Sequence, residues 1–372
     1  MIAADQWRAY NEAVDSIRSA AEAEVREGVA SWLEGHPGAT VAEAREEAVR
    51  IMRGAVQRHD KAAASLAAEW YDAQGRAQGA RLDRAVTAPA FSAEAVSRLA
   101  RYQVRKYQDG DLAGFAAMCG EFAANDAMRS VNDTILRNAR RDKSRGARFA
   151  RVTSGRNTCA FCLMLAGRGA VYHTRESAGA FSEWHRHCTC KVVPSFSGDQ
   201  WETLVEGRDP KAICDRLREI ERLIGARQGS AEFSREVALR DPEWLYGGEA
   251  SISFEEGHRH EQREVQTAEW LRARGMSCEF RKTRENESKR TSDVRINGVP
   301  WEFKQPKGTG KNNVNNQFNE ASGQSDHLVI DCSRSPFSFE EICVKARDCL
   351  SRRSDFSQVI VIDSEHFAHF TK

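Results

Sequence analysis

Apolar residues recur at helical spacing through almost the whole of residues 1–150. Thr40 and Glu43 have the spacing of a capping box, which opens a helix, and Pro37 interrupts the pattern just before them. The predicted helices cover about 4–33, 40–74, 92–107 and 111–140. We therefore expect a helical N-terminal domain.

The pattern becomes α/β from Phe254 onwards. Leu328–Ile330 and Val359–Ile362 are near-continuous apolar runs, which is typical of parallel strands buried on both faces. The predicted elements are a helix over about 255–274, a strand at 278–282, a hairpin around 297–298, a helix over 312–322, a strand at 327–333, a helix over 338–353 and a last strand at 358–363. This order predicts an αβββαβ core.

The pattern predicts a multidomain α + α/β protein. Its expected parts are a helical domain (1–150), a Cys/His block (151–198), a connector (199–252) with one helix from about Lys211 to Ile224, and a C-terminal α/β domain (253–372). No stretch of about 18 apolar residues occurs, so we expect no transmembrane helix. The N-terminus lacks the basic and apolar regions of a signal peptide.

The candidate catalytic residues lie on the predicted hairpin around Asn297-Gly298. Asn297-Gly298 favours a two-residue type I′ turn, which needs positive φ at both central residues. Ile296 then faces Val299, and counting back brings Asp293 opposite Glu302. Lys304 shares the face of Glu302, because side chains alternate along a strand, whereas Val294, Trp301 and Phe303 fill the other face.

Two carboxylates placed opposite each other normally destabilise a sheet. A divalent cation such as Mg²⁺ turns their repulsion into binding, and a lysine beside it can orient an attacking water. The spacing Asp-x8-Glu-x-Lys therefore indicates a metal-dependent phosphodiesterase. The alternative from spacing alone is a polar outer face with one Glu–Lys pair.

Four of the ten cysteines cluster between residues 159 and 190. Tetrahedral Zn²⁺ needs four ligands, and the C-x2-C spacing brings two thiolates to one ion. The pattern predicts a structural zinc in a reducing compartment, and the alternative is reduced cysteines without metal. The possible ligands are Cys159, Cys162, His185, His187, Cys188 and Cys190.

Basic residues are concentrated in two segments, Arg137–Arg156 and Arg281–Lys311. The first has eight Lys and Arg against one Asp, and the second has nine basic residues against four acids. Such segments suit a polyanionic partner, although solvated loops have the same composition.

Residues 1–200 resemble the Mu F-like phage head-morphogenesis (minor capsid) proteins. The resemblance lies in Ser154-Gly155, the following Cys-x2-Cys, and the run from Trp184 to Pro194. It implies His185, Cys188 and Cys190 as family positions, with His187 an addition. It also implies a few copies in a virion or prophage-derived particle, near portal and capsid components and packaged DNA.

The C-terminal pattern is similar to the PD-(D/E)xK nuclease superfamily. Residues 258–365, with Trp301-Glu-Phe-Lys304, Asn316-Gln317 and the run from Gln324 to Asp331, resemble the tRNase toxins of contact-dependent inhibition proteins. Ser292 stands where the superfamily name has Pro. The resemblance implies action on tRNA in the bacterial cytoplasm and a cognate immunity protein. The implied site residues are Asp293, Glu302 and Glu261 as metal ligands, Lys304 as the catalytic lysine and Gln317 as a substrate or water contact.

Two alternatives remain open. His258 and His260 could serve metal-independent RNA cleavage, but residues two apart do not share a helix face. The chain could also be a non-enzymatic minor capsid protein whose C-terminal domain only binds nucleic acid or a partner. The favoured hypothesis is a phage-derived toxin whose C-terminal endonuclease cleaves RNA, with tRNA as the expected substrate.

Overall fold

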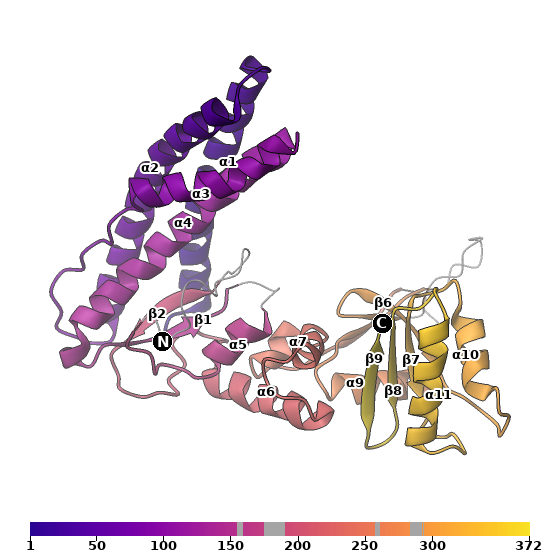
Figure 1. Cartoon of the computed structure of the whole chain (residues 1–372). Helices are drawn as coiled ribbons and strands as arrows, with labels where there is room; N and C mark the ends of the chain where they lie inside the picture. Colours follow the sequence, from indigo (N-terminus) through magenta and orange to yellow (C-terminus); the bar gives the residue numbers. More distant parts are fainter. Residues whose placement is uncertain (155–158, 175–189, 257–260, 283–291, 293) are drawn as a thin grey trace. The chain divides into compact units, whose positions relative to one another are not determined.

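The computed structural model (Figure 1) describes residues 1–154, 159–174, 190–256, 261–282, 292 and 294–372. The chain divides into two compact units. Unit 1 comprises Met1–Thr158 and Leu165–Lys211, and unit 2 comprises Cys159–Met164 and Ala212–Lys372. The two units are described separately below.

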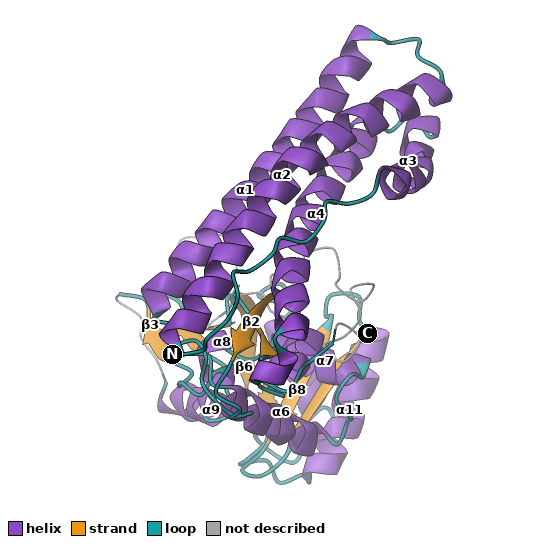
Figure 2. Ribbon diagram, turned by 90° about the vertical axis from the view of Figure 1, so that its left-hand side faces the viewer, coloured by secondary structure: helices purple, strands orange, loops and turns teal. Residues whose placement is uncertain are grey.

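Unit 1 is built on the predicted helices: α1 (Ala4–Gly35), α2 (Val41–Ala77), α3 (Ala93–Gln108) and α4 (Leu112–Arg141). The long helices α1, α2 and α4 lie side by side (Figure 2). The predicted capping box is confirmed, because Thr40 Oγ1 accepts from the Glu43 N–H (3.3 Å) while Glu43 accepts from the Thr40 N–H (2.7 Å). Ser92 and Asp111 cap α3 and α4 in a similar way.

The apolar stripes of these helices form one core, centred on residues such as Val25, Met52 and Phe115. After α4 come a 3₁₀ turn (Lys143–Arg145) and the antiparallel pair β1 (Arg148–Val152) and β2 (Lys191–Ser195). The short helix α5 (Ala160–Ala166) lies between these strands in sequence. None of the helices in the described residues is long and apolar enough to cross a membrane.

A buried charged cluster joins α2 to α4. The Arg129 guanidinium contacts three carboxylates: Asp126 (2.5 Å), Asp133 (2.9 Å) and Asp60 (3.0 Å). Asp60 also accepts from the Phe91 N–H (3.1 Å). Burial, reinforced by the negative charge of Asp126, raises the pKa of Asp60 to about 7. The folded chain therefore binds a proton at Asp60 more tightly than the unfolded chain.

We expect Asp60 to make unit 1 less stable as the pH rises from about 4 to about 7. A carboxyl group whose pKa is raised by folding stabilises the protein below its unfolded pKa, and that contribution is lost as the pH rises through the folded pKa. Asp60→Asn should flatten this dependence in denaturant titrations followed by helix content, while Asp109→Asn at the exposed end of α3 should not. Equal pH slopes in wild type and Asp60→Asn would contradict this assignment.

Unit 2 contains a seven-stranded mixed sheet in the order β3-β4-β5-β6-β7-β8-β9. The pairs β3–β4, β6–β7 and β7–β8 are parallel and the others are antiparallel. The strands are β3 (Ile252–Phe254), β4 (Cys278–Phe280), β5 (Val294–Ile296), β6 (Val299–Lys304), β7 (His327–Asp331), β8 (Gln358–Ile362) and β9 (Phe367–Thr371). The predicted core is present with a strand added at each edge, so the prediction that 358–363 is the last strand was wrong.

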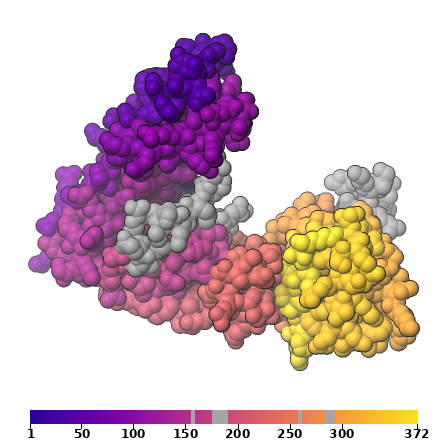
Figure 3. Space-filling model, viewed as in Figure 1, coloured from indigo at the N-terminus to yellow at the C-terminus, as the bar shows by residue number. Residues whose placement is uncertain are grey.

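Helices cover both faces of this sheet (Figure 1). Helix α9 (Gln262–Arg272) packs on one face with Phe303 and Val329, and α10 (Asn313–Ala321) and α11 (Phe339–Arg352) pack on the other with Leu328 and Ile330. The outer side of α11 and β9 forms the yellow part of the surface in Figure 3. Helix α9 begins at Gln262 instead of near 255, because residues 252–254 pair with β4 as a strand.

The predicted connector contains three helices, α6 (Pro210–Ile224), α7 (Ala231–Ala238) and α8 (Pro242–Leu245), and its part from Ala212 onwards belongs to unit 2. Asp241 accepts a hydrogen bond from Ser277 beside β4, and Leu239 packs against the α9-side core. Glu236 on α7 pairs with His369 on β9 (2.6 Å). The segment before β3 is therefore part of the same folded unit as the sheet.

Candidate active site

The hairpin that the sequence predicts is confirmed. Asn297 and Gly298 have φ values of 48° and 85°, and Ile296 pairs with Val299. Residues outside the hairpin also stabilise the turn. The Asn297 side-chain amide donates to the Leu239 carbonyl, and its oxygen accepts from the Ser277 N–H (3.1 Å). The register that places Glu302 on β6 is therefore fixed at both the turn and the strands.

Glu302 and Lys304 lie on the sheet face that α10 and α11 partly cover. Glu302 pairs with Leu328 and Lys304 with Ile330, and both partners belong to the core beneath α10 and α11. The same face of β4 and β5 carries the exposed pair Glu279–Arg295. Glu302 and Lys304 thus lie on β6 at a boundary. On one side of them this sheet face is covered by α10 and α11, and on the other side it is open to solvent.

The carboxylate of Glu302 is buried, with only 1% of the residue exposed, and the Lys304 ammonium donates to it at 2.6 Å. Lys304 is partly exposed and lies at the end of β6. Removing a carboxylate from water is costly unless charge and hydrogen bonds compensate. A solvated outer face, the alternative that spacing allows, therefore does not describe Glu302, and a polar pair held at such a cost is typical of a functional site.

The structure brings together only some of the predicted site residues. Asp293 lies outside the described residues, although the Val294–Trp301 pair beside it has the predicted register. Gln317 is buried on α10, which contacts β6. Glu261 is the exposed residue preceding α9, where its N–H donates to Glu264 (3.3 Å). The described residues contain no group of three His, Cys, Asp or Glu side chains suited to a metal.

A second polar cluster lies at the carboxyl ends of β6 and β7, on the α9 side. The Gln305 amide donates to Thr267 Oγ1 (3.1 Å) and to Asp331 Oδ2 (3.2 Å), which also accepts from Thr267 (2.6 Å). The other Asp331 oxygen accepts from the Ser333 N–H (3.0 Å) and hydroxyl (2.6 Å). Because both of its oxygens already accept hydrogen bonds, Asp331 helps to hold Gln305, the residue that follows Lys304, in place.

The sequence analysis missed this cluster. Its signal was available, because Gln305 directly follows Lys304 and Asp331 ends a buried parallel strand. Side chains at the carboxyl ends of adjacent parallel strands meet at one edge of a sheet.

We expect Thr267→Val to lower the free energy of unfolding by roughly 1–2 kcal/mol, because the buried Thr267 hydroxyl is lost and the half-buried Asp331 carboxylate and Gln305 amide lose a partner. Thr267→Ser keeps the hydroxyl and should retain most of the stability. Thermal unfolding of the full chain measures both variants. A Thr267→Val protein as stable as the wild type would show that these hydrogen bonds do not contribute to stability.

The predicted zinc ligands are only partly described. His185, His187 and Cys188 lie outside the described residues. Cys162 is buried, and its N–H donates to the Cys159 sulfur at 3.4 Å. Cys159 directly precedes α5, so this contact is a hydrogen bond at the start of a helix, and the zinc site stays a prediction.

Some basic side chains of the first basic segment, Arg137–Arg156, are already paired or buried within the fold. Arg141 pairs with Asp142 (2.7 Å), Arg145 pairs with Asp83 (2.9 Å), and Arg151 is buried.

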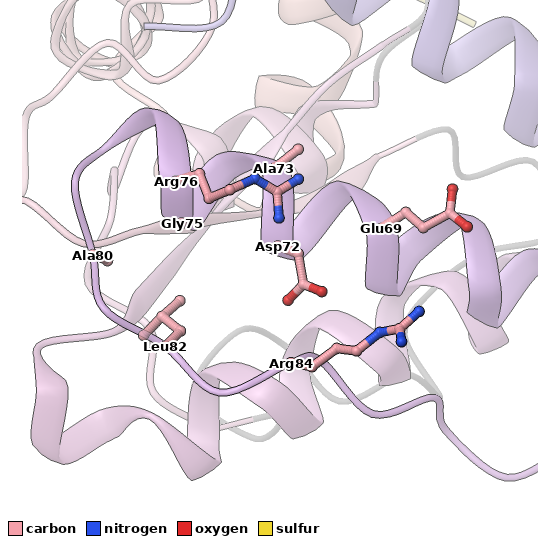
Figure 4. A pocket seen from close by; sticks show the side chains of 8 residues that line it. All are labelled: Glu69, Asp72, Ala73, Gly75, Arg76, Ala80, Leu82 and Arg84. Carbon is pink, nitrogen blue, oxygen red and sulfur yellow. The ribbon is translucent and has the colours of Figure 1, made fainter.

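A hollow of about 760 Å³ beside the end of α2 contains charges of both signs, and Figure 4 shows its lining. Asp72 in that lining accepts from the Ala85 N–H (2.9 Å), so it holds the chain between α2 and α3.

Comparison with known families covers both parts of the chain. Residues 289–367 match the model of the contact-dependent growth inhibition CdiA C-terminal domain, a span that includes Asp293, Glu302, Lys304 and Gln317. Residues 1–220 match the model of the VG15 protein family. The chain therefore has a phage gene-15 region followed by a segment similar to the CdiA C-terminal domain. The chain belongs to the VG15 protein family.

Two phage proteins are similar in sequence to part of this chain. The Gene 15 protein of Mycobacterium phage D29 is 29% identical over 135 residues, which cover 28% of this chain and 49% of that protein. The Gene 15 protein of Mycobacterium phage L5 is 31% identical over 105 residues, which cover 18% of this chain and 34% of that protein. The chain thus spans about half of the first relative and a third of the second.

Among solved structures, the CdiA-CT/CdiI toxin and immunity complex from Burkholderia pseudomallei matches 33% of this chain and 100% of its own chain. The sequence identity is 22% and the TM-score is 0.27.

Proposed function

We propose that unit 2 is a metal-dependent endonuclease that cleaves RNA, with tRNA as its substrate. The main support for this proposal is the buried Glu302 carboxylate, which lies 2.6 Å from the Lys304 ammonium. Both residues lie where the part of the sheet face under α10 and α11 meets the part open to solvent. The CdiA C-terminal match, which spans both residues, supports a toxin role. The choice of tRNA and the PD-(D/E)xK type rest on the sequence resemblance.

The roles follow from the chemistry of the side chains. Asp293 and Glu302 would hold a Mg²⁺ or similar ion, with Glu261 as a possible further ligand implied by the resemblance. When bound, such an ion activates water and offsets charge on the phosphate. Lys304 orients the attacking water and stabilises negative charge near the scissile phosphate. Gln317 contacts the substrate or water from α10.

The test offers the purified full chain total RNA and duplex DNA, with Mg²⁺, with a chelator, and with Mg²⁺ restored after chelation. We expect discrete tRNA fragments only when the metal is present, and sequencing their ends locates the cut. Cleavage that persists in chelator would reject the metal mechanism and favour the histidine alternative. A full chain that cleaves neither nucleic acid and does not inhibit bacterial growth would favour the non-enzymatic capsid protein.

We also propose that the phage region places this toxin in a virion or prophage-derived particle, as the Mu F-like resemblance suggests, in contact with portal or capsid components. The toxin would act in the bacterial cytoplasm, and a cognate immunity protein would neutralise it. Co-expression of a small neighbouring gene should restore growth to cells that express the full chain. Growth that no neighbouring gene restores would argue against an immunity partner.

We further propose a structural zinc held within the set Cys159, Cys162, His185, Cys188 and Cys190. Elemental analysis of the full chain should find about one zinc per chain, because one tetrahedral ion uses four such ligands. Cys159→Ser combined with Cys162→Ser should remove it, while Cys214→Ser should not. A zinc content that is unchanged in the double variant would contradict the ligand set.

A further inference from the structure

Unit 1 contains a hollow of about 530 Å³ that neither proposed site uses. It lies along α4, beside the segment between α2 and α3 and the residues that follow α5. Its described lining is Ala88, Pro89, Asp133, Leu136, Arg137, Arg140, His173 and Thr174.

Positive charge is concentrated on this side of α4. Arg137, Arg140 and Lys143 are exposed and follow one another at intervals of three residues, so the two arginines share one helix face. Within the described part of the chain, none of the three has a carboxylate in ion-pair contact, in contrast to Arg141 and Arg145. The cationic side chains at this hollow are therefore available to an external anion.

His173, in the segment that follows α5, supports the same conclusion. Its Nδ1 atom is buried and has no hydrogen-bond partner among the described residues. Burial, with the charges of Lys143 and Arg148, lowers the pKa of His173. Among the described lining residues, Asp133 is the acid, and it already pairs with Arg129 (2.9 Å). The described part of the hollow thus has donors and positive charge without a free carboxylate.

We propose that this hollow binds a phosphate group, supplied by the backbone of a nucleic acid strand. Arg137 and Arg140 offer planar guanidinium groups, whose paired N–H donors match two phosphate oxygens. His173 provides a further donor from the segment that follows α5. The site is in unit 1, so it is independent of the nuclease proposed for unit 2.

The test compares full-chain proteins that all carry Lys304→Ala, so that the proposed nuclease does not cut the probe. One protein adds Arg137→Gln and Arg140→Gln. Its matched control adds Arg98→Gln and Arg101→Gln, two exposed arginines with the same spacing on α3. Binding of a fluorescent 20-base-pair DNA duplex is measured over a range of salt concentrations, without and with millimolar orthophosphate.

We expect the Arg137/Arg140 variant to bind the duplex at least about tenfold more weakly than the control pair. The slope of log affinity against log salt should also fall by about 2, since each lost phosphate contact removes about 0.9. An unchanged melting temperature excludes misfolding, and Arg137→Lys with Arg140→Lys should retain most of the binding. Equal affinities and slopes for the two variant pairs would overturn the proposal.

The orthophosphate arm separates the two sources of the phosphate group. If the free anion competes with the duplex in the control pair but not in the Arg137/Arg140 variant, the hollow accepts phosphate itself. If it competes in neither while the affinity difference persists, the polymer backbone is required. Competition to the same extent in both proteins would place the phosphate site elsewhere and contradict the assignment.

Discussion

Cells that express the full chain with Lys304→Met should grow normally, while cells that express the wild-type chain should stop growing. Lys304 donates to the buried Glu302 carboxylate, and methionine keeps an unbranched side chain one atom shorter while removing the charge and the donor. A positioned proton-transfer or charge-stabilising group contributes about 10²–10⁴-fold to rate. RNA cleavage at saturating substrate should therefore fall by about a hundredfold or more.

The control for this variant is Lys307→Met, in the exposed segment directly after β6. It removes the same charge within three residues of Lys304, so a general electrostatic contribution to RNA binding would affect both variants. We expect it to keep its cleavage rate at saturation and its toxicity. Equal losses of rate in the two variants would mean that Lys304 acts only as one of many surface charges.

Glu236→Ala should destabilise unit 2 by about 3–5 kcal/mol, the usual cost of leaving one member of a buried ion pair without its partner. Glu236 accepts from Arg240 (3.2 Å), whose side chain is fully buried, and from His369 on β9 (2.6 Å). Burial opposes ionisation of Glu236, but the hydrogen bonds and charges of these two partners lower its pKa overall. The cluster therefore fastens α7 to the last strand of the sheet.

Chemical denaturation of the full chain, followed by the aromatic signal of unit 2, measures this loss. Glu232→Ala, an exposed position on the same helix, should cost less than about 1 kcal/mol. Replacing both Glu236 and Arg240 by methionine should recover much of the stability, because the buried Arg240 charge is then no longer present without its carboxylate. A double variant no more stable than Glu236→Ala would argue that packing alone holds α7 in place.

The elements that sequence analysis predicted well are those encoded by neighbouring residues. Thr40 with Glu43, and Ser338 with Glu341, set helix starts through capping boxes, and both are present in the structure. Asn297-Gly298 fixes a hairpin register because few other residues adopt positive φ at both turn positions. Local steric and hydrogen-bonding preferences were sufficient in these cases.

The elements that were missed depend on distant partners. Strand β3 has three residues and exists because it pairs with β4, more than twenty positions later. Strand β9 and helix α7 are linked by a Glu236–His369 contact across 133 residues. A polar segment such as 231–238 gives no sign of such a partner, and so the sequence pattern indicated only a connector.

The candidate site shows the same division. Alternation along β6 placed Glu302 and Lys304 on one face, and the structure confirms that they meet. Alternation could not show that Glu302 is buried, because burial depends on α10 and β7, which come later in the chain. The cluster of Thr267, Gln305 and Asp331 also joins three separate segments, so it becomes visible only when the carboxyl ends of β6 and β7 are considered together.

The account rests on Glu302 as part of a phosphodiesterase site, and single-turnover cleavage of tRNA by wild-type and Glu302→Gln full-chain proteins across a Mg²⁺ titration tests it most directly. Glutamine keeps the shape of the buried side chain but removes its charge. We expect wild-type cleavage to rise with Mg²⁺ and the variant to be at least about a hundredfold slower at every Mg²⁺ concentration. A folded Glu302→Gln protein that cleaves tRNA at the wild-type rate would contradict the account.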